Sequence, residues 1–265
     1  MTTYSTMKNS VKITLIISLS VLSSNNMIGQ SAREIADKAA NAIDFPSMEM
    51  TSTLKIYDNR GRERVRQLVT ASKKFNGITK TMIKFTAPAD VKGTTMLVFD
   101  NEESDDDMWI YMPALRKSRR IVSSEKSKSF MGSEFTNADM SRPILDDFVY
   151  EILREETLDG ISCWLIEARC KDEDVEDKNG FMRQVSWIEK GTYLTHKVAY
   201  YDLDNELYKV QYTRDFRKQS SGGYFAFFME KENVQNGRKS IMVIDKFQEG
   251  SSLSESAFSP NQLGK

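Results

Sequence analysis

Residues 108–140 read MWIYMPALRKSRRIVSSEKSKSFMGSEFTNADM, and the rest of the chain is interpreted around this stretch. Its first part, 109–115, predicts a strand with apolar side chains on both faces, because Trp109 and Tyr111 alternate with further apolar residues. Pro113 cannot donate a hydrogen bond to a neighbouring strand, so an edge or bulged position is expected there. A strand that is apolar on both faces needs cover on both sides.

The remainder of the stretch is first basic and then apolar. The basic part is a candidate docking patch for phospholipid headgroups or for an acidic face of a membrane partner: Arg116, Lys117, Arg119 and Arg120. A charged edge that prevents aggregation is the alternative.

The apolar part is a candidate movable flap with Gly132 as its hinge: Phe130, Met131, Gly132 and Phe135. The alternative is a loop that plugs the sheet permanently. Thr136 and Asp139 have the spacing of a capping box, which predicts a short helix start after the flap.

Upstream and downstream, the sequence predicts one helix followed by a long series of strands. SAREIADKAANAI (31–43) has apolar residues at helical spacing, with Ser31 as cap and Glu34 three residues on. From Met50 onwards, period-two segments alternate with turn signals, of which Asn76-Gly77 and Asp159-Gly160 predict hairpins. The pattern favours a continuous antiparallel meander of eleven or twelve strands, either closed into a barrel or open. In 208–216, aromatic and apolar residues alternate with polar ones, as a sheet curved around a cavity requires.

Three segments carry a family resemblance: WIYMPALRKSRR (109–120), SFMGSEF (129–135) and the closing AFSPNQL (257–263). They resemble the outer-membrane lipoprotein-sorting proteins of the periplasmic LolA-like superfamily. The resemblance implies a mainly β (α+β) fold, a half-open antiparallel β-barrel of about 11 strands with an N-terminal helix and a short helical lid. It also implies an apolar cavity that takes acyl chains.

Composition and the first 30 residues bear on the compartment. The chain has 265 residues, of which 37 are basic and 38 acidic, so it lacks the strong basic excess of a nucleic-acid binder. Lys8 and Lys12 precede a short apolar run, 13–22, which predicts a cleaved signal peptide over 1–30 and a single domain over 31–265. Because no cysteine lies near the expected cleavage zone, we expect a periplasmic protein that is not lipidated.

Catalytic and metal chemistry find little support in the sequence. The single histidine, His196, lies in a predicted strand, and the sequence contains neither an H-E-x-x-H nor a G-x-S-x-G motif. The acidic runs 102–107 and 172–177 lack the EF-hand pattern and are expected to be solvated loops. Cys163 and Cys170 lie seven residues apart, about 23 Å in an extended strand, so we expect unpaired thiols unless the chain folds back between them. We therefore expect no enzyme, no metal and no cofactor.

The leading hypothesis is a carrier that binds acyl chains of lipoproteins or lipids and moves them between the inner and outer membranes. The chain's 14 methionines and 14 phenylalanines are suited to a cavity that accepts variable guests. Strand alternation suggests six lining residues: Trp109, Tyr111, Leu115, Trp164, Ile166 and Trp187. Its expected partners are the acyl chains, an inner-membrane transporter and an outer-membrane acceptor, and a monomer is expected. The alternative is an envelope protein-interaction module that docks a membrane transporter and carries no lipid.

Overall fold

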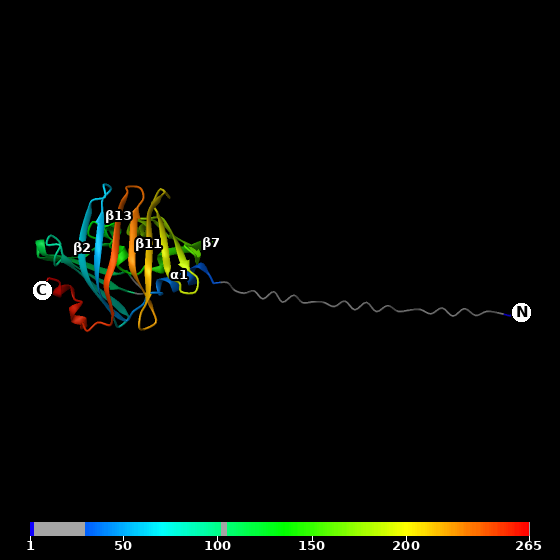
Figure 1. Ribbon diagram of the computed structural model, residues 1–265, viewed down its shortest axis with the longest axis horizontal. Coiled ribbons are helices and arrows are strands. Elements are labelled where there is room, and N and C mark those ends of the chain that lie inside the picture. Colours follow the sequence, from blue (N-terminus) through cyan, green and yellow to red (C-terminus); the bar gives the residue numbers. More distant parts are fainter. Residues whose placement is uncertain (3–29, 102–104, 265) are drawn as a thin grey trace.

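The computed structural model describes residues 1–2, 30–101 and 105–264. Its central feature is one antiparallel sheet of 13 strands, arranged in the order β6-β5-β4-β3-β2-β1-β13-β12-β11-β10-β9-β8-β7 (Figure 1). The strands are β1 Ser47–Tyr57, β2 Glu63–Phe75, β3 Ile78–Ala87, β4 Thr95–Asp100, β5 Asp107–Met112, β6 Lys117–Ile121, β7 Phe148–Leu158, β8 Ile161–Cys170, β9 Arg183–Glu189, β10 Thr195–Tyr201, β11 Leu207–Lys218, β12 Tyr224–Asn233 and β13 Arg238–Glu249. The predicted signal peptide lies outside the described residues, apart from its ends.

The sheet is a meander because local turn chemistry joins most neighbouring strands. Asn76 and Gly77 have φ values of 48° and 88°, and Asp159 and Gly160 have 50° and 86°. Two successive positive φ values are the signature of the tight turn that matches the twist of a hairpin. The pairing of β1 with β13 is the long-range contact that joins the two halves. Among the described strands β6 and β7 do not pair with each other, so the sheet stays open.

The strand count corrects the prediction of about 11. The basic residues 117–121 form β6, an edge strand that pairs with β5. Four of its five residues are exposed, so it lacks the alternation by which a half-buried strand is recognised. The predicted strand 109–115 ends early, since Pro113 begins a 3-10 turn, Pro113–Leu115, between β5 and β6. The acidic run 172–177, expected as a loop, lies mostly in helix α2, Glu173–Asn179, with Asp172 as its N-cap.

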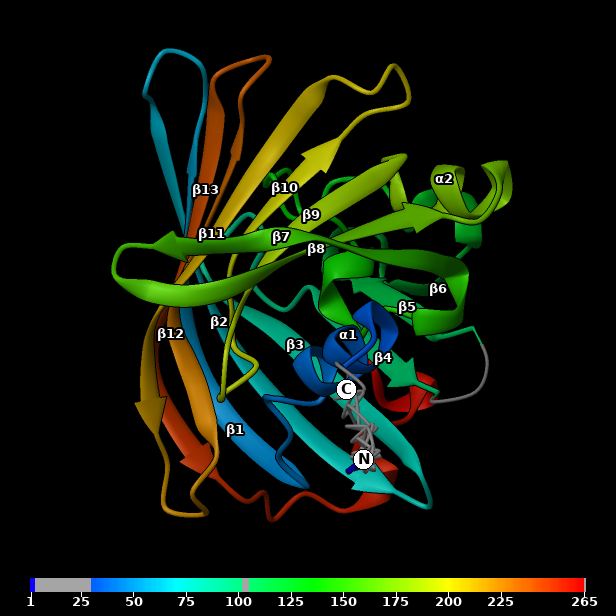
Figure 2. The ribbon, with the colours of Figure 1, turned by 90° about the vertical axis from the view of Figure 1, so that its right-hand side faces the viewer.

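Helix α1, Ala32–Ala40, lies inside the curve of the sheet (Figure 2). Its N-terminus has the predicted capping box: the Glu34 amide donates to Ser31 Oγ, and the Ser31 amide donates to the Glu34 carboxylate. Ala32 and Ile35 are buried against Ile166 of β8 and Ile188 of β9. The predicted N-terminal helix is therefore confirmed, and it packs on the concave face. No helix of the described residues is long and apolar enough to cross a membrane.

The opposite, convex face is covered over β2 to β5 by the chain's last residues. Phe258 is only 1% exposed and packs with Leu263 against Ala71 and Leu97. Lys73 Nζ donates to two backbone carbonyls of this C-terminal segment, those of Ser251 and Leu253. This half of the sheet is therefore apolar on both faces, with a different cover on each.

Candidate functional site

The site is a partly open cavity of about 580 Å³ bounded by the concave face, α1 and the segment between β6 and β7. We call that segment, residues 122–147, the cover segment. The volume lies within the range of about 300–1,000 Å³ typical of small-molecule sites. α1 and the loop after it contribute Ala36, Ala39, Ala40, Ile43, Asp44 and Phe45, and strands β1 to β4 contribute Met48, Met50, Ser52, Leu68, Thr70, Ser72, Thr79, Thr81, Ile83 and Asp100. The cover segment contributes Phe130, Phe135, Thr136, Ala138, Asp139, Met140, Ser141, Arg142, Pro143 and Leu145. The part of the chain from β7 to β13 contributes Phe148, Tyr150, Ile166, Ala168, Asn179, Phe181, Gln184, Ser186, Ile188, Thr195, Val198, Tyr200, Gln211, Met229, Met242 and Ile244.

One wall of the cavity is built from methionine and aromatic side chains. Met48 and Met50 of β1, Met229 of β12 and Met242 of β13 lie within one apolar cluster. The remaining members of that cluster are Ile43, Phe45, Phe225, Phe227, Ile244 and Phe247. Methionine is unbranched and polarisable, so such a wall adapts to guests of different shape. We call the members of this cluster that line the cavity the methionine wall: Ile43, Phe45, Met48, Met50, Met229, Met242 and Ile244.

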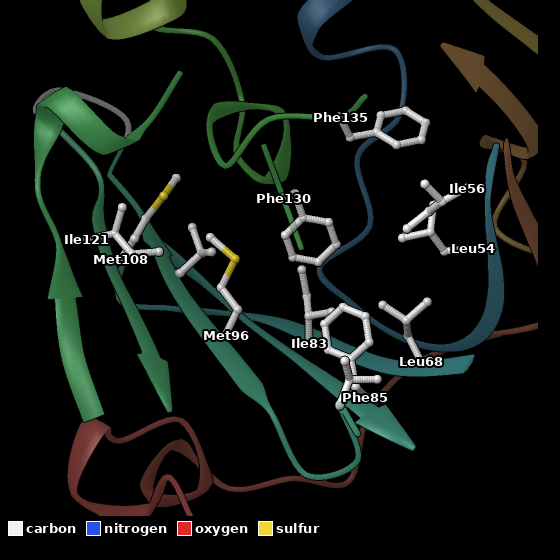
Figure 3. Close-up of a cluster of buried hydrophobic side chains, with 12 residues drawn as sticks. Leu54, Ile56, Leu68, Ile83, Phe85, Met96, Met108, Ile121, Phe130 and Phe135 are labelled. Carbon is white, nitrogen blue, oxygen red and sulfur yellow. The ribbon is translucent and has the colours of Figure 1, made fainter. Parts of the chain in front are cut away.

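The cover segment inserts two phenylalanines into the concave side of the sheet (Figure 3). Phe130 is 1% exposed and stacks at a tilt on Phe85 of β3, with ring centroids 5.6 Å apart. Phe135 is 4% exposed and joins the same core cluster. Both rings also line the cavity. Two of the four predicted flap residues therefore form part of the cavity wall.

The other two flap residues form the turn of this cover. Met131 and Gly132 have φ values of 51° and 78°, and the Phe130 amide donates to the Phe135 carbonyl across the turn. Arg238 donates to the Gly132 carbonyl at 3.1 Å, and Arg66 donates to the Met131 carbonyl. The turn is thus tied to β2 and β13 through its backbone.

Buried ion pairs also fasten the cover segment to the sheet. Glu134 lies 3.4 Å from Lys209 of β11 and 3.1 Å from Arg238 of β13. The Glu134 amide donates to Ser240 Oγ of β13 at 2.9 Å. Glu134 and Lys209 are 5% and 7% exposed, and truncating Glu134 would leave the buried Lys209 amine without its ion-pair partner, which is costly.

A second pair joins Asp139 of the cover segment to Lys231 of β12, at 2.8 Å. Burial disfavours the charged amine of Lys231, but Asp139 and Tyr200 together outweigh this effect, so that the pKa of Lys231 is raised. Burial likewise opposes the Asp139 carboxylate, but Lys231, with the Thr136 amide and Lys209, more than compensates, so that the pKa of Asp139 is lowered. Both groups are therefore charged over the ordinary pH range. Thr136 and Asp139 make the reciprocal bonds of the predicted capping box, but the helix expected there is only the 3-10 turn Ala138–Met140, whose N-cap is Asn137.

The structure places the six predicted lining residues on different faces. Ile166 lines the cavity, and Trp164 lies on the same side but packs beside α1, stacked on Tyr193. Trp109 and Tyr111 face the opposite side, under the C-terminal segment. Trp187 lies in the convex cluster with Leu165, and its indole donates to Glu156. Leu115 is 58% exposed in the 3-10 turn. Of the six, Ile166 alone lines the cavity. The prediction was wrong for Trp109, Tyr111 and Trp187 because alternation distinguishes the two faces of a strand but does not say which one is concave. It was also wrong for Leu115, which lies outside the strand, and for Trp164, which is covered beside α1.

The four residues of the predicted docking patch lie together on the free edge of the sheet, in β6 and just before it. All four are exposed. Arg119 pairs with Glu125 at 2.6 Å, and Arg120 pairs with Asp107. Within the described chain, Arg116 and Lys117 have no acidic partner, and the apolar Leu115 and Val122 beside the patch are 58% and 53% exposed.

Groups with chemical reactivity are engaged in ordinary structural contacts. His196 Nε2 lies 2.9 Å from a Glu189 carboxylate oxygen, and its ring meets Phe216 edge-on. Cys163 and Cys170 are both free thiols, as expected, and burial raises the pKa of Cys170 to about 12. The described residues contain no cluster of histidine, cysteine and acidic side chains that could hold a metal ion.

Comparison with known proteins places this geometry in a family. A family model whose description reads "-like: Uncharacterized protein" matches residues 77–265. No curated protein matches the chain. A crystal structure from Vibrio parahaemolyticus, of a domain assigned to the outer membrane lipoprotein-sorting proteins, has 26% identity and a TM-score of 0.81, covering 88% of this chain and 98% of its own.

Two further solved structures have the same fold. A DUF1329 family protein from Desulfovibrio piger is 29% identical with a TM-score of 0.80, over 88% of this chain and 97% of its own. A LolA superfamily protein from Nitrosomonas europaea is 19% identical with a TM-score of 0.68, over 87% and 98% of the two chains, and shows a likeness of fold. The matched family model, the open 13-stranded sheet and the covered cavity all agree with the predicted resemblance. The chain therefore belongs to a LolA-like family.

Proposed function

We propose that the protein is a periplasmic carrier that binds acyl chains of lipoproteins or lipids in its cavity and shuttles them between the inner and outer membranes. The observation that carries this proposal is the cavity of about 580 Å³ between the methionine wall and the cover segment. A fold that only needed stability would fill this space, because protein interiors are ordinarily packed without large voids.

Burial of an acyl chain supplies enough free energy to hold the chain in the cavity. Each buried methylene contributes about 0.8 kcal/mol, so a chain of a dozen carbons contributes ~10 kcal/mol before the costs of ordering. Release needs a route out of the cavity, and the cover segment is the candidate for a part that lifts. Its attachment by ion pairs and backbone hydrogen bonds favours a closed resting state.

The proposed carrier would work in the periplasm and meet a membrane or a membrane protein at each end of its path. Residues 1–30 would direct export and be removed, leaving 31–265 as a single monomeric domain without a lipid anchor. The exposed basic edge at Arg116 and Lys117, flanked by Leu115 and Val122, would meet a membrane surface or an acidic face of a transporter or acceptor. We infer a binding role and no catalytic one.

Native mass spectrometry of protein purified from the periplasm without detergent tests the proposal. The wild-type protein should retain copurifying lipid. Ala39 of α1 lines the cavity, so Ala39→Trp should displace most of that lipid, whereas Lys38→Trp on the exposed neighbouring position should not. A folded wild-type protein without lipid, or equal lipid in Ala39→Trp, would contradict the carrier and favour an interaction module.

A further inference from the structure

One part of the cavity wall is polar but uncharged. It consists of five hydroxyl side chains on three neighbouring strands, β1, β2 and β3: Ser52, Thr70, Ser72, Thr79 and Thr81. We call this group the hydroxyl shelf. Met50 is the cross-strand partner of Thr70, and Met48 is that of Ser72, so the shelf borders the methionine wall directly.

Of these five hydroxyls, those of Ser52 and Thr70 are buried and have no hydrogen-bond partner within the described part of the protein. Ser72 and Thr81 bond to each other, with their oxygens 2.9 Å apart. Ser52 and Thr70 are 3% and 6% exposed, and their hydroxyls make no hydrogen bond with any residue that the structure describes. No described side-chain nitrogen or oxygen is both sealed from solvent and unpartnered. The free hydroxyls of Ser52 and Thr70 therefore open onto the cavity.

The position of these groups argues against a purely hydrocarbon guest. Threonine and valine have nearly the same shape, so valine could fill such sites without a polar atom. A guest that displaced water and offered no hydrogen bond would leave the hydroxyls unpaired, and unpaired buried polar groups are unfavourable. A guest with its own acceptors or donors at the shelf would avoid that loss.

Four charged residues of the described chain line the cavity, and three of them, Asp100, Asp139 and Arg142, are paired within the protein. The fourth, Asp44, is acidic and offers no counter-charge to an anionic headgroup. Asp100 lies 3.0 Å from Arg142, and Asp139 lies 2.8 Å from Lys231. The shelf itself carries no charge. An ionised headgroup would therefore find no free counter-ion on it, whereas hydroxyls suit ester carbonyls and alcohols.

We propose that the hydroxyl shelf is a subsite for an uncharged hydrogen-bonding group attached to an acyl chain, such as the ester-linked glycerol of an acylglycerol. The methionine wall then takes the chain. This inference rests on the proposed function, since it specifies which cargo the same cavity prefers.

Two ligands with equal chain length, monolauroylglycerol and dodecane, distinguish a cavity that prefers a hydrogen-bonding group from one that binds the hydrocarbon chain alone. Their affinities are measured by displacement of a fluorescent acyl probe from the wild-type protein and from Thr70→Val/Ser72→Ala/Thr81→Val. This variant removes the bonded pair Ser72 and Thr81 together, so that neither hydroxyl is left alone. It should weaken monolauroylglycerol about tenfold and change dodecane less than about twofold.

The matched control is Thr51→Val on the other face of β1, which should change neither affinity. Thr70→Val alone should act in the same direction by about threefold, and it remains informative if the triple variant unfolds. Equal effects on the affinities for both ligands, or no effect on either, would contradict the proposed subsite at the hydroxyl shelf without contradicting the proposed carrier function. Failure of the wild-type protein to bind either ligand would overturn both.

Discussion

Lys231 of β12 and Asp139 of the cover segment form an ion pair inside the molecule, with Lys231 Nζ 2.8 Å from each carboxylate oxygen of Asp139. The Lys231 side chain is only 3% exposed. Together with Glu134, which is held by Lys209 and Arg238, this pair fastens the cover to the strands at the back of the cavity. The cover can therefore lift only by separating opposite charges, of which those of Glu134, Lys209 and Lys231 are buried.

Breaking one partner of this pair should cost more than removing both. We expect Asp139→Asn to lower the free energy of unfolding by about 3–5 kcal/mol, because it leaves the buried Lys231 amine without its partner. Lys231→Met should cost less, because the Asp139 carboxylate that it leaves behind is 23% exposed and can be hydrated. The double variant should lose much less than the sum. Urea denaturation of the four proteins measures the coupling. Additive losses would show that the pair does not fasten the cover.

The pair also predicts how the cover responds to pH. The lowered pKa of Asp139 means that its contribution is complete above the unfolded carboxyl value of about 3.9 and is lost as pH falls through the still lower folded value. The raised pKa of Lys231 means that its contribution is complete below about 10.4 and is lost only above that. Hydrogen exchange of residues 126–142 should thus show constant protection from pH 5 to 9, after correction for intrinsic rates. Loss of protection between pH 7 and 5 would be inconsistent with a permanently charged pair.

The C-terminal segment should support the sheet without taking part in binding. Phe258 is 1% exposed and packs 5.6 Å from the ring of Phe75 on the convex face. Phe258→Ala should lower the free energy of unfolding by about 3–5 kcal/mol. The exposed neighbour Asn261→Ala should change it by less than about 0.5 kcal/mol. Probe affinity in the folded Phe258→Ala protein should equal that of wild type, and a large loss of affinity would show that the two faces are coupled.

The basic edge should matter for encounters with membranes. Arg116→Glu/Lys117→Glu reverses two exposed charges that have no acidic partner among the described residues. We expect transfer of a fluorescent acyl probe to anionic vesicles to slow by about tenfold at low salt, and by less as salt screens the charges. Arg60→Glu/Lys218→Glu makes the same change in net charge at other exposed positions and is the control. An unchanged rate in the first variant would remove the docking patch.

Local sequence signals predicted the elements of this fold well. Ser31 and Glu34 start α1 as expected, and the turn at Asn76-Gly77 joins β2 to β3. These features depend on neighbouring residues alone, so they can be recognised without knowing the rest of the fold. Strand β6 was missed because an exposed edge strand has no buried face to set a period.

The cavity lining was harder to predict because it depends on which way the sheet curves. On β11, Tyr208, Val210 and Tyr212 suggested the inward face, yet Lys209 and Gln211 point inward. Lys209 is accepted there because Glu134, 75 residues away, neutralises it. Such compensation between distant segments leaves no local pattern. The run of methionines at period two in 48–50, and the hydroxyls of Thr70 and Ser72 beside apolar neighbours, were the available signals.

Photocrosslinking with a fatty acyl probe that carries a diazirine near the chain end tests the central claim most directly. After irradiation and digestion, mass spectrometry locates the labelled residues. The account predicts labels on the methionine wall, at Met50, Met229 or Met242, and their loss in Ala39→Trp. Labels confined to the convex face around Trp187 or Phe258, or none at all on a folded protein, would contradict it.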